Sequence, residues 1–314
     1  MVRKNQAKTL NMRFLLFLLL IPLFLNASIK IKKDVADLDI DTTRSGWDIA
    51  IDRISLNLSS TSIQNQTNYE KFSNTHFKGD SQIVAESSLL FHSNYYAKHF
   101  VIFNTIFSEY GRNIIYPTDG KKIDNTTLDR IIISSDYTQK IWDFQHLWGG
   151  FDMGPYAQIS YQTQFIKQSG FNRTQILRFN TGLKLFDGKY LKNFYISLFG
   201  EEDFTYKNPR QSFGFNTGIN LQYNFNPNVK LVNYLNFKQY FLNNYPLQLS
   251  PELELEWNIR AESAIFKHFS IAPFFSFYLL KGKYFEKPAT NIMLGISLIY
   301  GQTFIDSKAQ KQEE

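Results

Sequence analysis

The densest row of charged side chains in the sequence lies between Pro251 and Ser263. Apolar residues occupy alternate positions there, and the positions between them are Glu252, Glu254, Glu256, Asn258, Arg260 and Glu262. Side chains of an extended chain alternate between its two faces, so this pattern puts four glutamates and one arginine in a single row. The preceding segment, Asn228–Phe241, presents Lys230 and Lys238 on its matching face.

Two interpretations of this charged row stay open. Like charges side by side are unfavourable unless opposite charges counter them. The row is therefore either one half of an ion-pair network that braces the protein, or an acidic wall that selects cations or binds a cationic solute. The identity of the neighbouring side chains decides between the two.

The sequence indicates no catalytic or metal centre. His92 and Ser93 are adjacent, so on a strand they point to opposite faces. Cysteine is absent, and no local cluster of histidines and carboxylates occurs. We expect no metal, no cofactor and no enzymatic activity; a hydrolase site assembled across strands is the alternative, because such sites are defined by geometry. The other histidines have no partner at an interpretable spacing: His76, His99, His146 and His268.

The chain begins with the features of a secretory signal. Four basic residues precede twelve apolar residues, Phe14–Leu25, which Asn26 and Ala27 follow. Twelve residues are too few for a membrane helix of about 20 but fit the apolar region of a signal peptide, roughly 7–15 residues. We predict a signal peptide over residues 1–27, with an uncleaved N-terminal anchor as the alternative. Residues 28–46 are expected to form a charged periplasmic tail, with a plug folded into the lumen as the alternative. A start at Met12 would give a shorter signal of the same type.

Alternation with a period of two dominates the rest of the chain and indicates strands. It is clearest in Asn291–Phe304 and Ser212–Phe225, where one face is apolar and the other is mostly small or polar. Twelve strand-like segments follow the tail: Trp47–Leu58 (with a change of phase, typical of a bulge, near Asp52–Arg53), Ser81–Asn94, Lys98–Tyr110, Leu128–Trp142, Pro155–Lys167, Arg173–Phe186, Lys192–Tyr206, Ser212–Phe225, Asn228–Phe241, Pro251–Ser263, Phe266–Leu280 and Asn291–Phe304.

The lengths of the connections favour a membrane barrel. After strands two, six, eight and ten the links are very short, whereas those after strands one, three, nine and eleven are longer. Short turns alternating with longer loops, and an even strand count, are typical of bacterial outer-membrane barrels. Segments of 12 to 15 residues also exceed the usual soluble strand of about 5–6. One long link, Asp143–Gly154, is an exception; a soluble β-sandwich or lipocalin-like barrel is the alternative fold.

The net charge of +6 overstates how basic the mature protein would be. The predicted signal peptide carries four of the 34 basic residues and none of the 28 acidic ones, so its removal leaves 30 against 28, or +2. Binding of nucleic acid needs a clustered basic surface. We therefore expect no nucleic-acid partner.

The last strand segment also contains a short motif with a known counterpart. Gly295-Ile-Ser-Leu298-Ile-Tyr300 resembles the terminal-strand insertion signal of outer-membrane barrels, in which apolar residues follow a glycine at the third and fifth positions. Met293 departs from the polar residue usual in the family, and the chain continues past the final aromatic residue, Phe304. Trp47, the stretch Leu128–Tyr137 and the strand count look like uncharacterised outer-membrane barrel families. This implies contact with outer-membrane lipid and with the barrel-assembly machinery.

We therefore expect an all-β, antiparallel up-and-down barrel of about twelve strands over residues 47–304, with a polar tail over 305–314. It would reside in the outer membrane of a Gram-negative envelope, as a structural barrel or a narrow, porin-like passive pore, cation-preferring if the acidic row faces an open lumen. Twelve strands enclose less space than a wide 16-stranded porin. The alternatives are an outer-membrane hydrolase and a surface adhesin that uses the loop Ser59–Asp80.

Overall fold

The computed structural model describes residues 45–77, 83–115, 123–145, 147–167 and 172–306. The predicted signal peptide, nearly all of the predicted N-terminal tail and most of the predicted C-terminal tail lie outside these residues. Among the described residues, no helix is long and apolar enough to cross a bilayer. The described part of the chain also contains three short 3₁₀ turns, η1 (Gln66–Asn68), η2 (Thr75–Phe77) and η3 (Leu247–Leu249).

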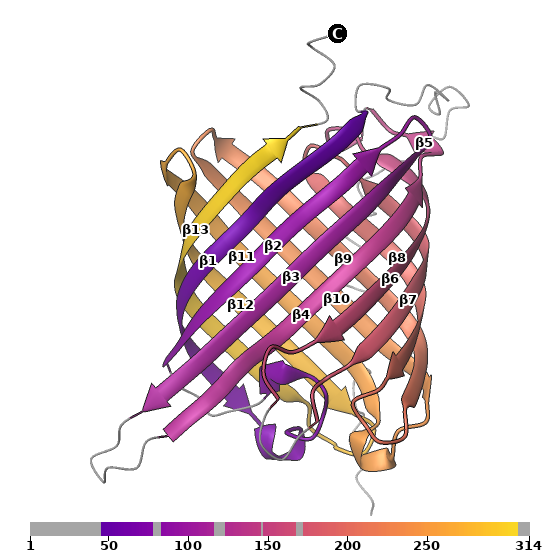
Figure 1. Ribbon diagram of the computed structural model, residues 1–314, viewed down its shortest axis with the longest axis vertical. Coiled ribbons are helices and arrows are strands. Elements are labelled where there is room, and N and C mark those ends of the chain that lie inside the picture. Colours follow the sequence, from indigo (N-terminus) through magenta and orange to yellow (C-terminus); the bar gives the residue numbers. More distant parts are fainter. Residues whose placement is uncertain (1–44, 78–82, 116–122, 146, 168–171, 307–314) are drawn as a thin grey trace, which may run out of the picture. The chain divides into compact units, whose positions relative to one another are not determined.

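The strands form one antiparallel sheet that closes on itself through the pairing of β4 with β6 (Figure 1). The two-residue strand β5 (Trp142–Asp143) pairs with β6 beside the ring, so twelve strands make up the barrel and the predicted fold class is confirmed. Those twelve strands are β1 Gly46–Gln64, β2 Ile83–Tyr96, β3 Phe100–Ile115, β4 Ile123–Gln139, β6 Asp152–Thr163, β7 Ile176–Phe186, β8 Leu191–Asp203, β9 Arg210–Asn226, β10 Val229–Asn243, β11 Pro251–Phe266, β12 Phe269–Gly282 and β13 Ala289–Ile305.

The two ends of the barrel differ in their connections. Ile49 pairs with Ile305, so β1 begins where β13 ends; we call this the terminal end and the opposite one the loop end. The terminal end carries the short turns 97–99, 187–190, 227–228 and 267–268, together with the long link 140–151 that contains β5. The longer connections lie at the loop end, as the sequence predicted. The first of these connections, between β1 and β2, begins later than predicted, because β1 continues as far as Gln64.

The outside of the barrel is apolar and is bordered by aromatic side chains at both ends. Leu298 is 46% exposed and Leu294 58%, whereas Ser297 between them is 3% exposed on the inner face. An apolar band between two aromatic girdles is the surface that a bilayer requires of a barrel. The exposed aromatic residues near the ends include Trp47, Tyr137, Tyr223, Phe225, Phe266, Phe269 and Phe304 at the terminal end, and Phe165, Phe204, Phe213, Phe241 and Tyr284 at the loop end.

Two local features set which side chains enter the lumen. The register of β1 shifts between Ile51 and Ile54, which is the predicted bulge; such an insertion changes the face on which the following residues lie. Gly295 is required by close approach, since a Cβ there would lie 2.4 Å from the Leu58 carbonyl oxygen and 2.8 Å from the Phe274 ring. The glycine of the predicted insertion signal therefore also has a packing role in this barrel.

The outward face of β13 gives a direct test of the membrane assignment. Leu298→Lys should make folding into lipid less favourable by about 2–4 kcal/mol, because the charge would enter the apolar band. Asn220→Lys, on the lumen face of β9 and partly exposed, should cost much less. Folding titrations in lipid vesicles measure both. Equal costs would show that the assigned faces are wrong.

Candidate functional site

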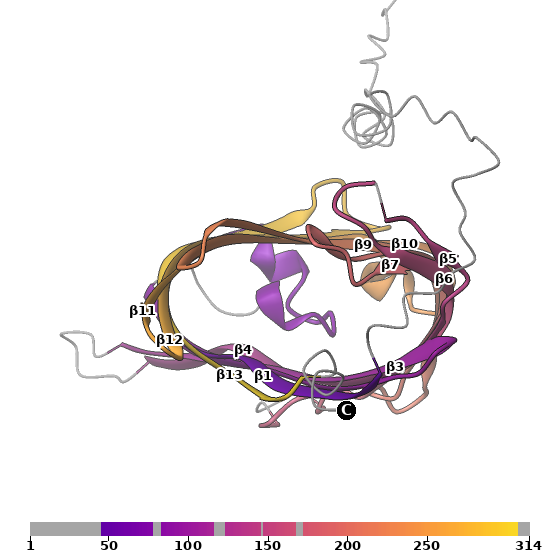
Figure 2. The same cartoon turned by 90° about the horizontal axis from the view of Figure 1, so that it is seen from above.

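The first long connection folds into the barrel. Residues 65–77, which we call the plug segment, place η1 and η2 inside the ring of strands (Figure 2). Tyr69 and Phe77 are fully buried and Phe72 is 5% exposed. They form the main apolar cluster of the described residues with Leu128, Tyr278, Leu280, Ala289 and Met293 of the barrel wall. Burial of three aromatic side chains, each worth about 1.5–3 kcal/mol, holds the segment in the lumen.

Hydrogen bonds tie the plug segment to β12, β13 and the loop between them. The Tyr69 hydroxyl donates to the Lys287 carbonyl oxygen at 2.8 Å and accepts from the Gly282 amide at 3.2 Å. Asn291 Nδ2 donates to the His76 carbonyl oxygen at 2.7 Å inside the barrel. These bonds satisfy plug backbone and hydroxyl groups that burial would otherwise leave without partners.

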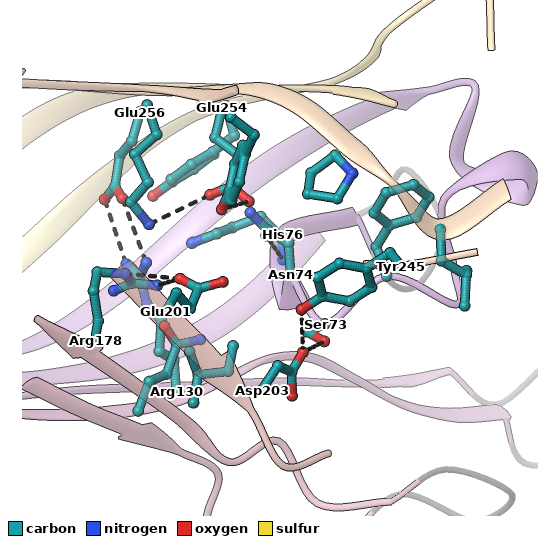
Figure 3. A pocket seen from close by; sticks show the side chains of 18 of the residues that line it. Ser73, Asn74, His76, Arg130, Arg178, Glu201, Asp203, Tyr245, Glu254 and Glu256 are labelled. Atoms are coloured by element: carbon teal, nitrogen blue, oxygen red, sulfur yellow. Dashed lines mark hydrogen bonds and ion pairs between the residues drawn. The ribbon is translucent and has the colours of Figure 1, made fainter. Parts of the chain in front are cut away.

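Asp203, fully buried at the loop end of β8, anchors the other side of the plug segment. It accepts hydrogen bonds from the Ser73 hydroxyl at 2.7 Å, the Tyr245 hydroxyl at 2.8 Å and the Thr205 amide at 2.9 Å. Figure 3 shows Ser73, Asp203 and Tyr245 converging beside the plug. Three different loop-end connections therefore meet at one carboxylate.

A cavity of about 70 Å³ remains between the plug segment and the wall. This is room for a few water molecules. Glu254 and Glu256 lie on one side of it, opposite Arg130 and Arg178 (Figure 3). At this level the lumen is nearly filled, and the polar groups that face the remaining space carry charges of both signs.

His76 is the titratable group of the plug that faces this cavity. Its ring is 2% exposed and stacks on Tyr278, with ring centroids 3.7 Å apart. Burial, and then the positive charge of Arg130, lower the pKa of His76 to about 3. The imidazole is therefore neutral at physiological pH, and its Nε2 lies 3.3 Å from Glu109 Oε1 without forming an ion pair there.

The structure places the predicted charged row of β11 in the lumen, with a base beside each of its glutamates. Glu254 lies 3.6 Å from Lys238, and Glu262 lies 3.0 Å from Lys230 and 2.6 Å from Arg260. Glu252 lies 3.7 Å from Lys281, and Glu256 lies 3.4 Å from Arg130. The row is thus one side of an ion-pair network.

The predicted insertion-signal residues lie on the outer surface, apart from Gly295. Leu298 faces outwards in the apolar band, and Phe304, 53% exposed, belongs to the aromatic girdle at the terminal end. Tyr300 packs on Phe269, with ring centroids 5.2 Å apart. None of the four contributes to the lumen network.

His92 lies among carboxylates. Its Nδ1 is 2.7 Å from Asp52 Oδ2 and its Nε2 is 3.4 Å from Asp48 Oδ1. Both ring nitrogens are occupied, and Ser93 is on the other face of β2, so this pair has no nucleophile–base geometry. Across the described residues, no group of three or more His, Cys, Asp or Glu side chains converges in a way that could hold a metal ion.

The charged residues of the site that were not singled out from the sequence include Glu109, Arg130, Arg178 and Glu201. Arg178 and Glu201 form a buried ion pair between β7 and β8, with Nε 2.8 Å from Glu201 Oε2. Arg130 Nε lies 2.9 Å from Glu109 Oε1. The sequence could have indicated these residues, since each of them lies at a lumen-facing position of a predicted strand.

Fold and site together define a class: a closed twelve-stranded β-barrel with a membrane-type exterior and a charged, nearly filled lumen.

No protein-family model and no curated protein matches the chain. Similar solved structures include an outer membrane channel from Pseudomonas putida F1, with 9% identity and a TM-score of 0.43 over 86% of this chain and 99% of that one. Outer membrane phospholipase A from Escherichia coli has 10% identity and a TM-score of 0.39, covering 79% of this chain and 96% of that one. OmpT, an outer membrane protein of Vibrio cholerae, has 8% identity and a TM-score of 0.34, covering 83% and 100%. Likenesses this distant carry no information on function.

The depressed pKa of His76 predicts how docking of the plug depends on pH. A detached plug would expose His76, with a pKa near 6.5, so the detached state binds more protons between about pH 6.5 and pH 3. The equilibrium constant for docking of the plug should not change above about pH 6.5. Below that pH it should fall by up to about tenfold per pH unit. Hydrogen exchange of residues 65–77 between about pH 5 and pH 8 measures this.

The control is His76→Gln, which cannot titrate. Any contribution of carboxylates to the pH dependence is common to the wild type and the variant. Identical pH profiles for the wild type and His76→Gln would contradict the assignment.

Proposed function

We propose that the protein is a narrow outer-membrane pore, with its terminal end towards the periplasm. The apolar band between two aromatic girdles supports insertion into a bilayer. The polar, charged inner face supports a hydrated lumen. Short turns at the terminal end and longer connections at the loop end support the orientation.

The observation that carries this proposal is the combination of a charged lumen with the inserted plug segment. A barrel with a purely structural role needs no charged interior, and apolar side chains would fill its lumen at lower desolvation cost. Here the plug leaves space for a few water molecules beside ionised groups. The expected cargo is inorganic ions and very small polar solutes, and the expected conductance is small.

The charge balance of the lumen modifies the predicted cation preference. Every glutamate of the β11 row has a base within 4 Å, so the row alone creates little net potential. Asp203 is held by hydroxyl and amide donors. We propose a weak preference for cations that comes from this carboxylate rather than from the row.

The surface-adhesin alternative assigned adhesion to the loop Ser59–Asp80. The described part of this loop either extends β1 or lies inside the barrel as the plug segment, and so lends that alternative no support. The hydrolase alternative gains no supporting geometry at His92.

Planar-bilayer recordings of the refolded protein test the pore and its selectivity. Wild type should conduct, with a reversal potential under a KCl gradient that is weakly on the cation side. The triple variant Glu252→Gln, Glu254→Gln and Glu256→Gln should shift clearly towards anions, because each of Lys281, Lys238 and Arg130 loses one carboxylate partner, and Arg130 keeps only Glu109 among the described residues. The shift should shrink near 1 M salt, where the Debye length is about 3 Å.

Glu70→Gln, at an exposed position of the plug segment, is the control and should leave the reversal potential unchanged. Absence of conductance in wild type and variant would refute the pore. Conductance with identical potentials in wild type and triple variant would show that ions pass without meeting the row.

A further inference from the structure

One ion pair joins opposite walls of the barrel. Arg130 Nη1 and Nη2 lie 3.4 Å from the two carboxylate oxygens of Glu256. Arg130 is on β4 and Glu256 on β11, which lie six places apart in either direction round the ring of twelve strands. The two strands are therefore diametrically opposite in a barrel whose cross-section is flattened (Figure 2), and the pair joins the two walls across the lumen.

Both members of this pair are held in place from their own wall. On one side, Glu109 Oε1 lies 2.9 Å from Arg130 Nε, and the guanidinium carbon lies 5.1 Å from the centre of the Phe107 ring. On the other, Asn258 Nδ2 donates to Glu256 Oε1 at 3.1 Å. Side chains fixed in this way have little freedom to swing aside.

Other ion pairs between described residues of the barrel strands run along the wall. Arg178–Glu201, Lys238–Glu254, Lys230–Glu262 and Lys281–Glu252 each join adjacent strands, and Lys184–Asp136 joins strands two places apart. These pairs line the lumen, whereas Arg130–Glu256 crosses it.

We propose that the Arg130–Glu256 pair sets the size limit of the pore, as a transverse bar that divides the lumen into two narrow passages. This inference rests on the proposed pore function and names the residues that determine its specificity. A solute of sugar size would have to separate the two side chains, which leaves ions without their partners in a confined site and is strongly unfavourable. Small ions pass on either side without breaking the pair.

The plug segment lies against this bar. His76 Nε2 is 3.3 Å from Glu109 Oε1, the same oxygen that faces Arg130 Nε. The plug and the bar therefore meet through Glu109 and form successive barriers along the lumen.

The chain contains no cysteine, so a pair of introduced cysteines can first remove the bar and then restore a bridge by cross-linking. The double variant Arg130→Cys and Glu256→Cys removes the bar while the net charge of the site stays the same. Its single-channel conductance should rise at least twofold over wild type, and liposome swelling should show entry of small sugars that wild type excludes. Reaction with a bismaleimide that bridges the two thiols should restore the wild-type size limit in the same protein.

The matched control is Lys184→Cys and Asp136→Cys, a pair 2.7 Å apart on strands two places apart in the ring. It removes one charge of each sign, and its cross-link runs along the wall, so neither the variant nor the cross-link should change sugar entry much. A conducting wild type whose size limit is unaffected by removal of the bar overturns the inference but leaves the pore intact. No conductance in any of the proteins overturns both.

A milder variant covers the case in which the cysteine protein does not fold, as judged by heat-modifiable migration on gels. Arg130→Lys keeps a positive charge beside Glu109 but is shorter and cannot donate two hydrogen bonds to Glu256. Its size limit should lie between those of wild type and the open variant. A size limit identical to that of wild type would count against the bar.

Discussion

The ion pair between Arg130 and Glu256 connects the features of this lumen. Its two residues come from opposite walls, and the contact requires those walls to approach within the reach of two side chains. In such a confined space, water screens charges poorly, so each ionised group needs a nearby partner. The pairs around the bar meet this requirement: Glu109 beside Arg130, Lys238 beside Glu254, and Glu201 beside Arg178.

The plug segment follows from the same geometry. A connection that contains Tyr69, Phe72 and Phe77 would expose three aromatic side chains if it remained at the surface. Folded inwards, these side chains pack on the apolar part of the β12 and β13 lumen face, while Ser73 reaches Asp203. The loop end of the lumen is thus filled by an apolar cluster against one wall and a polar, charged cluster against the other. The remaining cavity lies between them.

Much of the fold follows from the sequence, because alternation with a period of two marks each strand and its two faces. The twelve segments, the bulge near Asp52–Arg53 and the alternation of short and long connections all correspond to the structure. The two-residue strand β5, the length of β1 and the inward fold of residues 65–77 were not predicted. These depend on packing between distant segments, which local alternation does not encode.

The candidate site was only partly accessible from the sequence for the same reason. Lys230 and Lys238 could be matched to the β11 row because their strand directly precedes it in the chain, and consecutive strands of a meander are neighbours. Arg130 could not be matched to Glu256 in this way. An up-and-down barrel of twelve strands does place the fourth and tenth strands opposite each other, but only the flattening of the barrel brings their side chains into contact.

The most direct test of this account is a double-mutant cycle on folding stability in lipid vesicles, using Arg130→Met, Glu256→Gln and the double variant. Residues on opposite walls that do not touch should have additive effects. The account predicts a coupling energy of about 1–3 kcal/mol, with the double variant less destabilised than the sum of the single ones. A coupling energy near zero would show that the two walls are not joined through this pair, and would contradict the description of the lumen.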